Sequence, residues 1–134
     1  MRKKLSVIIP AYNEEAVAEP AAASIGGILK RADIPYELLF VDDGSEDSTW
    51  EKISRLSSED PAIRGIRFSR NLGQDAAIMA GLTAAHGEGC VVIDCDLQHP
   101  PELIRALLAR FAEGDADVVA ASRYIGGGDS ASAV

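Results

Sequence analysis

Two carboxylates with the spacing of metal ligands follow an apolar run in the sequence. Asp94 and Asp96 come directly after Val91–Ile93 and are separated by Cys95 alone. Acids at the tip of a buried strand need water, a partner or a cation. Side chains alternate along an extended chain, so we expect Asp94, Asp96 and Gln98 on one side, about 7 Å apart at successive Cα atoms. Such oxygen ligands suit Mg²⁺, Mn²⁺ or Ca²⁺, although a solvated acidic turn explains these residues equally well.

The composition limits the partners that the chain can bind. Its 134 residues are enough for one domain, and 47% of them are hydrophobic. The formal net charge of -8 argues against nucleic acid, whose binding needs clustered Lys and Arg. Binding of phosphates would therefore need a local positive charge, such as a metal ion. No apolar run approaches the roughly 18 residues of a membrane span, and the N-terminal run is too short for a signal peptide. We therefore expect a cytoplasmic protein, in which the thiols of Cys90 and Cys95 stay reduced.

Five apolar runs of strand length recur along the chain. They are Leu5–Pro10, Tyr36–Asp42, Ile63–Ser69, Gly89–Asp94 and Asp117–Ser122. Segments with helical spacing separate them, which predicts the order βαβαβαβαβ and a mostly parallel α/β sheet with helices on both faces. Ligands of such sheets bind at the carboxyl ends of the strands. The polar residues at the predicted strand ends are therefore the candidate site.

Local signals predict where the helices begin and end. Ser48 and Glu51 have capping-box spacing, so a helix should start near residue 49. Gly87 should end the helix predicted over residues 73–86, and another helix is predicted over residues 101–114. Pro20 predicts a late or irregular first turn for the first helix.

Several α/β folds that bind nucleotides or phosphates are excluded by motif and position. The turn after the first strand reads Pro-Ala-Tyr-Asn-Glu rather than G-x-G-x-x-G, and no G-x-x-x-x-G-K-[ST] is present. A phosphatase of the haloacid dehalogenase type carries its Asp-x-Asp after the first strand, not the fourth. A phosphate-receiver domain has its acidic pair after the first strand and a lysine after the fifth, where this chain has Arg123.

The motifs "IIPAYNE", "VDDGSEDST", "IDCDLQHPPELI" and "ASRY", in this order and spacing, resemble one family. They are similar to those of family 2, GT-A type inverting glycosyltransferases, and within it to the polyprenyl-phosphate sugar synthases such as dolichol-phosphate mannose synthase. The likeness extends from Ser6 to about Gly128. The segment "SRNLGQDAAIMAGL" looks more like the glucosyltransferase branch, so the sugar and the base stay open.

The resemblance implies a role for each matching residue. Donor-nucleotide contacts are implied for Pro10, Tyr12, Glu14, Val41 and Asp43, with Asp42 orienting its loop. Mg²⁺ or Mn²⁺ would be held by Asp94, Asp96 and Gln98, with Asp94 also facing the sugar and Cys95 contributing only its backbone. Arg123 would bind phosphate oxygens through its forked donors. The implied catalytic residues are Asp94, Asp96 and Arg123.

The resemblance also implies a reaction. Residues 1–125 are expected to form a partial nucleotide-sugar-binding core, with 126–134 as a flexible tail, because the family's catalytic domain normally continues well past "SRY". The implied activity is transfer of a hexose from GDP-mannose or UDP-glucose to a polyprenyl phosphate at the cytoplasmic face of the membrane. The alternatives are transfer to a saccharide hydroxyl and a catalytically silent nucleotide-binding fragment.

Overall fold

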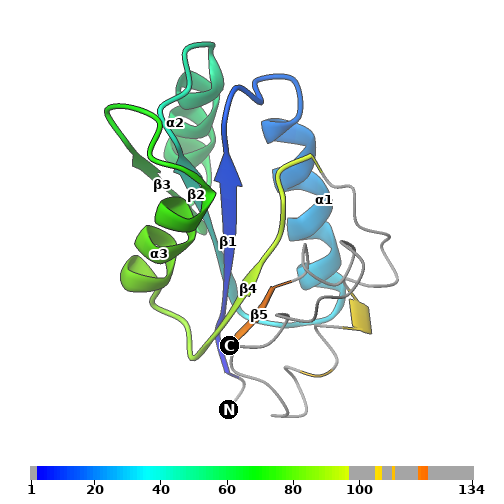
Figure 1. The fold of residues 1–134 in the computed structure, drawn as a ribbon. Coiled ribbons are helices and arrows are strands. Elements are labelled where there is room, and N and C mark those ends of the chain that lie inside the picture. Colours follow the sequence, from blue (N-terminus) through cyan, green and yellow to red (C-terminus); the bar gives the residue numbers. More distant parts are fainter. Residues whose placement is uncertain (1–2, 97–104, 107–109, 111–117, 121–134) are drawn as a thin grey trace.

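The fold is a parallel sheet between two layers of helices (Figure 1). It is seen in a computed structural model that describes residues 3–96, 105–106, 110 and 118–120. The strands are β1 (Leu5–Ala11), β2 (Tyr36–Asp42), β3 (Ile63–Arg67), β4 (Gly89–Val92) and β5 (Val118–Ala120). They are ordered β3-β2-β1-β4-β5, and every neighbouring pair is parallel. The predicted fold class is confirmed.

Three helices cover the two faces of the sheet. They are α1 (Ala18–Arg31), α2 (Thr49–Glu59) and α3 (Gln74–Ala84). α1 and α2 lie on one face, and α3 lies on the other (Figure 1). In the segment 101–114, where a helix was predicted, residues 105, 106 and 110 are helical, and the remainder lies outside the described residues. No helix in the described part of the chain is long and apolar enough to cross a membrane.

β1 is buried along its whole length because it is the central strand, and Ser6 is its one polar residue. All seven of its residues are buried, and their side chains alternate between the two faces. Val7 and Ile9 belong to the core cluster that includes residues of α1 and α2, whereas Ile8 belongs to the cluster under α3. A strand buried on both faces needs a nearly continuous apolar run, and this is the pattern that identified it in the sequence.

Pro10 is tolerated in this central strand because the β1–β4 ladder ends before it. The last paired residues are Ile8 and Val92, followed by one hydrogen bond from the Ile93 N–H to the Ile8 carbonyl oxygen (3.0 Å). Proline has no N–H to donate, so it fits where a ladder has already stopped. Beyond this point the chain after β4 bends away from β1 (Figure 1), which opens the sheet at the carboxyl ends of the two strands.

Two of the predicted helix signals are wrong. α2 does begin at Thr49, but Ser48 makes no side-chain capping bond, and the N–H and hydroxyl of Thr49 donate to Asp47 instead. α3 ends at Ala84, three residues before Gly87. Gly87 is needed for close packing, because a Cβ at this position would lie 2.7 Å from the carbonyl oxygen of Lys4.

Candidate functional site

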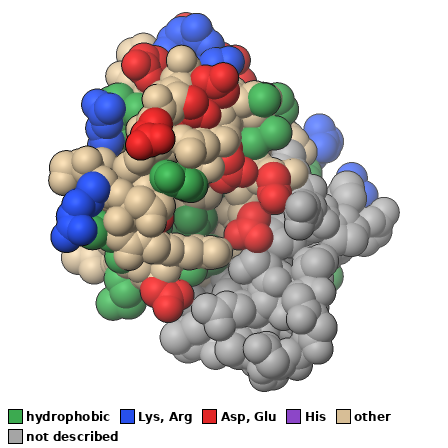
Figure 2. Space-filling view, turned by 45° about the horizontal axis from the view of Figure 1, so that its top comes forward, with side chains coloured by type: hydrophobic (Ala, Val, Ile, Leu, Met, Phe, Trp, Pro, Cys, Tyr) green, Lys and Arg blue, Asp and Glu red, His purple; other side chains and the backbone are tan. Residues whose placement is uncertain are grey.

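A pocket of about 220 Å³ lies where the strand order changes direction. The chain steps from β1 to β2 and β3, then returns to place β4 on the other side of β1, and ligands of open α/β sheets bind at such a point. The pocket is lined by Pro10, Ala11, Tyr12, Glu14, Asp43, Gln74, Asp94, Cys95 and Asp96. Acidic side chains spread across this end of the molecule (Figure 2).

The loop after β1 is held firmly against the start of α2. The Asn13 N–H donates to Ser45 Oγ and the Glu46 N–H donates to Asn13 Oδ1, both at 2.8 Å. The Glu14 N–H donates to the hydroxyl of Thr49, also at 2.8 Å. Tyr12, in the same loop, is 44% exposed and lines the pocket, where its ring can stack on a flat ligand.

The charged form of Glu14 is disfavoured in the pocket. Burial raises its pKa above the ordinary value, and a hydrogen bond from the Tyr12 N–H opposes this effect only in part. The nearby charges of Asp96 and Asp94 raise the pKa further. Negative charge is therefore concentrated at this site, and a bound cation would relieve the repulsion.

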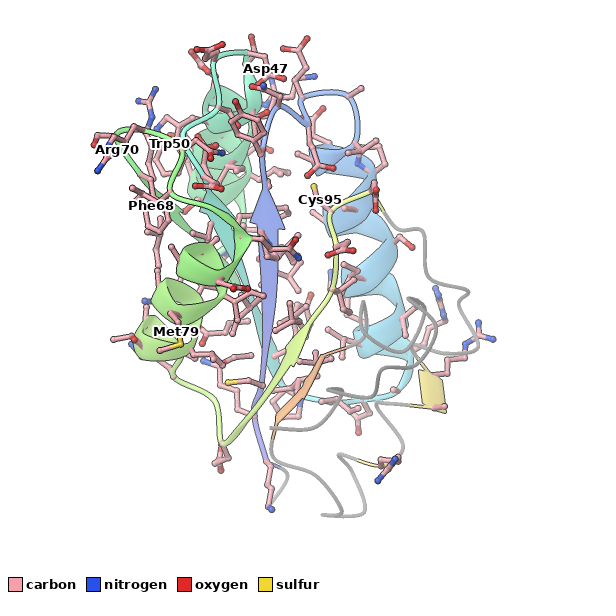
Figure 3. The ribbon with its side chains drawn as sticks, in the orientation of Figure 1. Asp47, Trp50, Phe68, Arg70, Met79 and Cys95 are labelled. Atoms are coloured by element: carbon pink, nitrogen blue, oxygen red, sulfur yellow. The ribbon has the colours of Figure 1, made fainter. Side chains whose placement is uncertain are left out.

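Asp94 and Asp96 reach the pocket, but the extended geometry that predicted their alignment is wrong. β4 ends at Val92, two residues before the predicted end, and Cys95 and Asp96 form a turn. Cys95 is 1% exposed, and Figure 3 places it beside α1. Burial, with the charges of Glu14, Asp96 and Asp94, raises the pKa of the Cys95 thiol to about 12, so the thiol stays protonated at neutral pH.

The two aspartates at the end of β2 have different roles. Asp42 is completely buried and accepts the Ser45 N–H at 3.0 Å, so it orients its loop as expected. Asp43 lines the pocket, but its two carboxylate oxygens also accept hydrogen bonds from Asn71, Leu72 and Gly73. The side chain of Val41, for which a nucleotide contact was predicted, is completely buried under α3 and does not line the pocket.

Gln74 is a pocket residue that the sequence did not reveal. It is the first residue of α3, and its Nε2 donates to Asp94 Oδ1 at 3.4 Å. No local pattern identifies it, because it reaches the pocket only when α3 packs on the sheet. Of the predicted site residues, Gln98 and Arg123 lie outside the described residues.

A second pocket adjoins the first at Tyr12. It has a volume of about 620 Å³ and lies between the loops that follow β2 and β3. Its lining includes Ser45, Phe68, Arg67 and Arg70. Figure 3 shows Phe68 and Arg70 at the carboxyl end of β3, away from Cys95. The first pocket is lined by four carboxylates, whereas the second has two guanidinium groups and the aromatic ring of Phe68 beside the single carboxylate of Glu46.

The pocket suits a cation that is bound together with a ligand. In the described residues, no three His, Cys, Asp or Glu side chains converge as a cage for a metal ion. Mg²⁺ is commonly held by one or two carboxylates plus phosphate oxygens of the substrate, which needs no such cage. The hard oxygens of Asp94 and Asp96 and the excess negative charge beside Glu14 fit this type of site.

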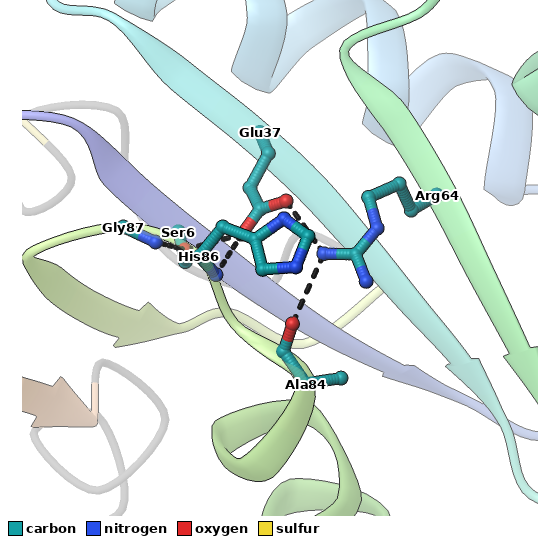
Figure 4. Close-up of polar contacts among 6 residues, drawn as sticks. All are labelled: Ser6, Glu37, Arg64, Ala84, His86 and Gly87. Carbon is teal, nitrogen blue, oxygen red and sulfur yellow. Dashed lines mark hydrogen bonds and ion pairs between the residues drawn. The ribbon is translucent and has the colours of Figure 1, made fainter.

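A polar cluster at the opposite end of the sheet has a structural role (Figure 4). The carboxylate of Glu37, 2% exposed, accepts hydrogen bonds from the Ser6 hydroxyl (2.6 Å), the His86 N–H (2.7 Å) and Arg64 Nη1 (2.8 Å). Arg64 also donates to the carbonyl oxygen of Ala84. Burial alone would raise the pKa of Glu37, but these bonds and the charge of Arg64 lower it to about 2. The cluster joins β1, β2 and β3 to the end of α3.

The sequence is similar to several glycosyltransferases. It is 42% identical over 125 residues to a dolichol-phosphate mannosyltransferase of Pyrococcus furiosus, covering 93% of this chain and 34% of the relative. It is 41% identical over 113 residues to an undecaprenyl-phosphate 4-deoxy-4-formamido-L-arabinose transferase of Salmonella paratyphi A, covering 84% and 35% respectively. The chain thus spans about a third of the length of these relatives.

A solved structure supports the same relationship. A mannosyltransferase of Pyrobaculum calidifontis, in complex with GDP-Man and Mn²⁺, superposes with a TM-score of 0.58 and 27% identity, over 72% of this chain and 28% of that one. The sequence pattern of glycosyl transferase family 2 matches residues 6–133, nearly the whole chain. With the GT-A arrangement of strands and the acidic pocket, this match establishes that the chain belongs to glycosyl transferase family 2.

Proposed function

We propose that the full-length protein transfers a hexose from a nucleotide sugar to a polyprenyl phosphate, and that this chain provides the donor site. The observation that carries the proposal is the pocket at the carboxyl ends of β1 and β4, whose lining includes Tyr12, Glu14, Asp94 and Asp96. A diphosphate alone would be repelled by these carboxylates, so the ligand must bring or share a cation. A nucleoside diphosphate sugar with a divalent metal ion satisfies this requirement.

The two adjoining pockets suit the two ends of such a donor. The diphosphate and sugar would lie over Asp94 and Asp96, and the nucleoside would extend past Tyr12 towards the second pocket. Phe68 and Arg70 can stack on a base or approach its polar edge. GDP-mannose and UDP-glucose are the donors that we propose to test first.

Mg²⁺ or Mn²⁺ would be held by Asp94 and Asp96, with Gln98 as a further ligand. Such an ion, when bound, supplies the positive charge that offsets the charge developing on the leaving nucleoside diphosphate. Arg123 would bind phosphate oxygens of the same group through its fork. Glu14 and Tyr12 would position the nucleoside, since both line the pocket wall next to β1.

The acceptor is proposed from its chemistry and from two relatives. A sugar hydroxyl must lose a proton as it attacks, which generally needs a base, whereas a phosphate monoester is already anionic at neutral pH. A phosphate oxygen can therefore attack the anomeric carbon directly, while the bond to the donor diphosphate breaks on the opposite face and the configuration inverts. The names of the Pyrococcus and Salmonella relatives include dolichol phosphate and undecaprenyl phosphate. A lipid acceptor implies a reaction at a membrane surface, and we propose the cytoplasmic face.

The test is a transfer assay with the full-length protein. Radiolabelled UDP-glucose or GDP-mannose is incubated with polyprenyl phosphate, polyprenol or an oligosaccharide, and the lipid is extracted. The proposal predicts label in the polyprenyl phosphate alone. Label in the oligosaccharide would instead assign the protein to transfer onto saccharide hydroxyls, and no label in any acceptor would favour a silent nucleotide-binding protein.

A further inference from the structure

The carboxylate of Asp43 is occupied by the loop that precedes α3. The Leu72 N–H donates to Oδ1 at 2.7 Å, and the Gly73 N–H and Asn71 Nδ2 each donate to Oδ2 at 3.1 Å. Asn71 Nδ2 also donates to the backbone carbonyl oxygen of Asp43 at 3.2 Å. Asp43 lines the pocket with only 5% of its surface exposed, and both of its carboxylate oxygens accept hydrogen bonds from the fold.

The next residue brings the same two loops into direct backbone contact. Gly44 has a φ of +76°, a conformation that favours glycine. A Cβ at this position would lie 2.3 Å from the carbonyl carbon of Arg70 and 2.4 Å from the nitrogen of Asn71. Figure 3 shows Arg70 on this loop, beside the carboxyl end of β3. Asp43 and Gly44 therefore fix the position of the 70–73 loop through hydrogen bonds and close backbone packing.

These contacts of Asp43 and Gly44 hold the loop that leads directly into α3. Gln74 follows Gly73 directly, lines the pocket and donates to Asp94 Oδ1. The four carboxylates of the pocket lining carry only acceptors when ionised, whereas the amide of Gln74 carries both donors and an acceptor. A sugar presents hydroxyls that need both, so Gln74 is suited to contact it.

We propose that Asp43 is a positioning residue that, through the 70–73 loop, sets Gln74 beside Asp94, and that Gln74 contributes to recognition of the donor's sugar. This inference rests on the proposed function, because it requires a nucleotide-sugar ligand. It differs from the role that the resemblance implies for Asp43, which is direct contact with the nucleotide.

A double-mutant cycle with two ligands tests the inference. Affinities of the chain for UDP-glucose and UDP, and for GDP-mannose and GDP, are measured with Mn²⁺ by calorimetry. Gln74→Ala should weaken binding of a nucleotide sugar by about fivefold, the size of one hydrogen bond, and leave the diphosphate unaffected. Asp43→Asn should weaken binding of the nucleotide sugar by a similar factor. The affinity of the double variant should fall by no more than the larger of the two single losses.

Hydrogen exchange and a matched control separate positioning from general damage. Exchange at the Leu72 and Gly73 amides should accelerate in Asp43→Asn but not in Asp60→Asn, which alters a carboxylate that accepts the Ala62 N–H at the other end of the sheet. Asn71→Ala is a milder variant that removes one donor to Asp43 and should act in the same direction if Asp43→Asn does not fold.

Three results discriminate between the proposals. Additive effects of Asp43→Asn and Gln74→Ala would contradict the coupling. A change in preference between uridine and guanosine ligands in Asp43→Asn, with sugar recognition intact, would show that Asp43 contacts the base and would overturn the inference. Failure of the wild-type chain to bind any of the four ligands would instead contradict the proposed function.

Discussion

The acidic residues divide into those whose carboxylates are held by the fold and those that we propose face a ligand. Asp42, Asp43 and Glu37 accept hydrogen bonds from the protein and are at most 5% exposed. Asp94 and Asp96 line the pocket together with Glu14, whose pKa is raised by burial and by their charges. Sequence position alone does not separate the two groups, because Asp42 and Asp94 both follow apolar runs.

Asp96 is predicted to be required for metal-dependent binding. Asp96→Asn removes the charge of a proposed metal ligand, so the affinity for a nucleoside diphosphate in Mn²⁺ should fall by at least about tenfold. Loss of a residue that only hydrogen-bonds to a metal ligand already lowers metal affinity by about that factor. Calorimetric titration measures the change. Asp75→Asn makes the same change of charge at an exposed residue that does not line the pocket, and it should bind as the wild type does. Equal losses in both variants would refute the ligand role.

Arg123 is predicted to recognise phosphate rather than the base. Arg123→Lys keeps the charge but loses the bidentate fork, so affinity for UDP and for GDP should fall together by about tenfold. The ratio of the two affinities, measured in the same titrations, should not change. A shift in that ratio would place Arg123 beside the base.

Among the elements, the ends of strands and helices depend on contacts that local sequence does not contain. The apolar runs predicted the strands because burial on both faces requires them. β4 ends early because its ladder with β1 stops at Val92, and α2 is capped by Asp47 rather than Ser48. Gln74 was missed for the same reason, since the distant Asp43 holds the loop that places it.

The Glu37 cluster is predicted to make stability depend on pH. The pKa of Glu37 in the folded chain is about 2, below the ordinary value of 4.5, so its stabilisation is complete above about pH 4.5 and is lost as the pH falls towards 2. At about 1.4 kcal/mol per pH unit, the loss in free energy of unfolding approaches about 3 kcal/mol. Urea unfolding between pH 2 and 6 measures it.

Two variants isolate this contribution. Glu37→Gln should lower the free energy of unfolding at pH 6. The amide nitrogen of glutamine is itself a donor, and it would face groups that donate hydrogen bonds to the carboxylate in the wild type. The variant should also flatten the pH dependence below pH 4.5. Glu59→Gln, at an exposed position at the end of α2, should leave the profile unchanged. An unchanged profile in Glu37→Gln would contradict the assignment.

In the whole molecule, the order of the strands explains why the site lies where it does. The sheet opens between β1 and β4, and the loops after β1, β2 and β4 and the start of α3 all reach that opening. The parallel direction of the strands could be predicted from the alternating apolar runs, and so could a pocket at their carboxyl ends, but the order of the strands in the sheet was not predicted. The second pocket could not be predicted, because it forms only where the loops after β2 and β3 approach each other.

Metal-dependent binding of a nucleoside diphosphate is the most direct test of this account. Thermal unfolding of the chain is followed with UDP-glucose, GDP-mannose, UDP and GDP, each in Mn²⁺ and in EDTA. At about 100 times its dissociation constant, a ligand should stabilise the chain by about 2.7 kcal/mol in Mn²⁺, and the shift should vanish in EDTA. Equal shifts in Mn²⁺ and EDTA would contradict the metal site at Asp94 and Asp96, and no shift with any ligand would contradict the donor site itself.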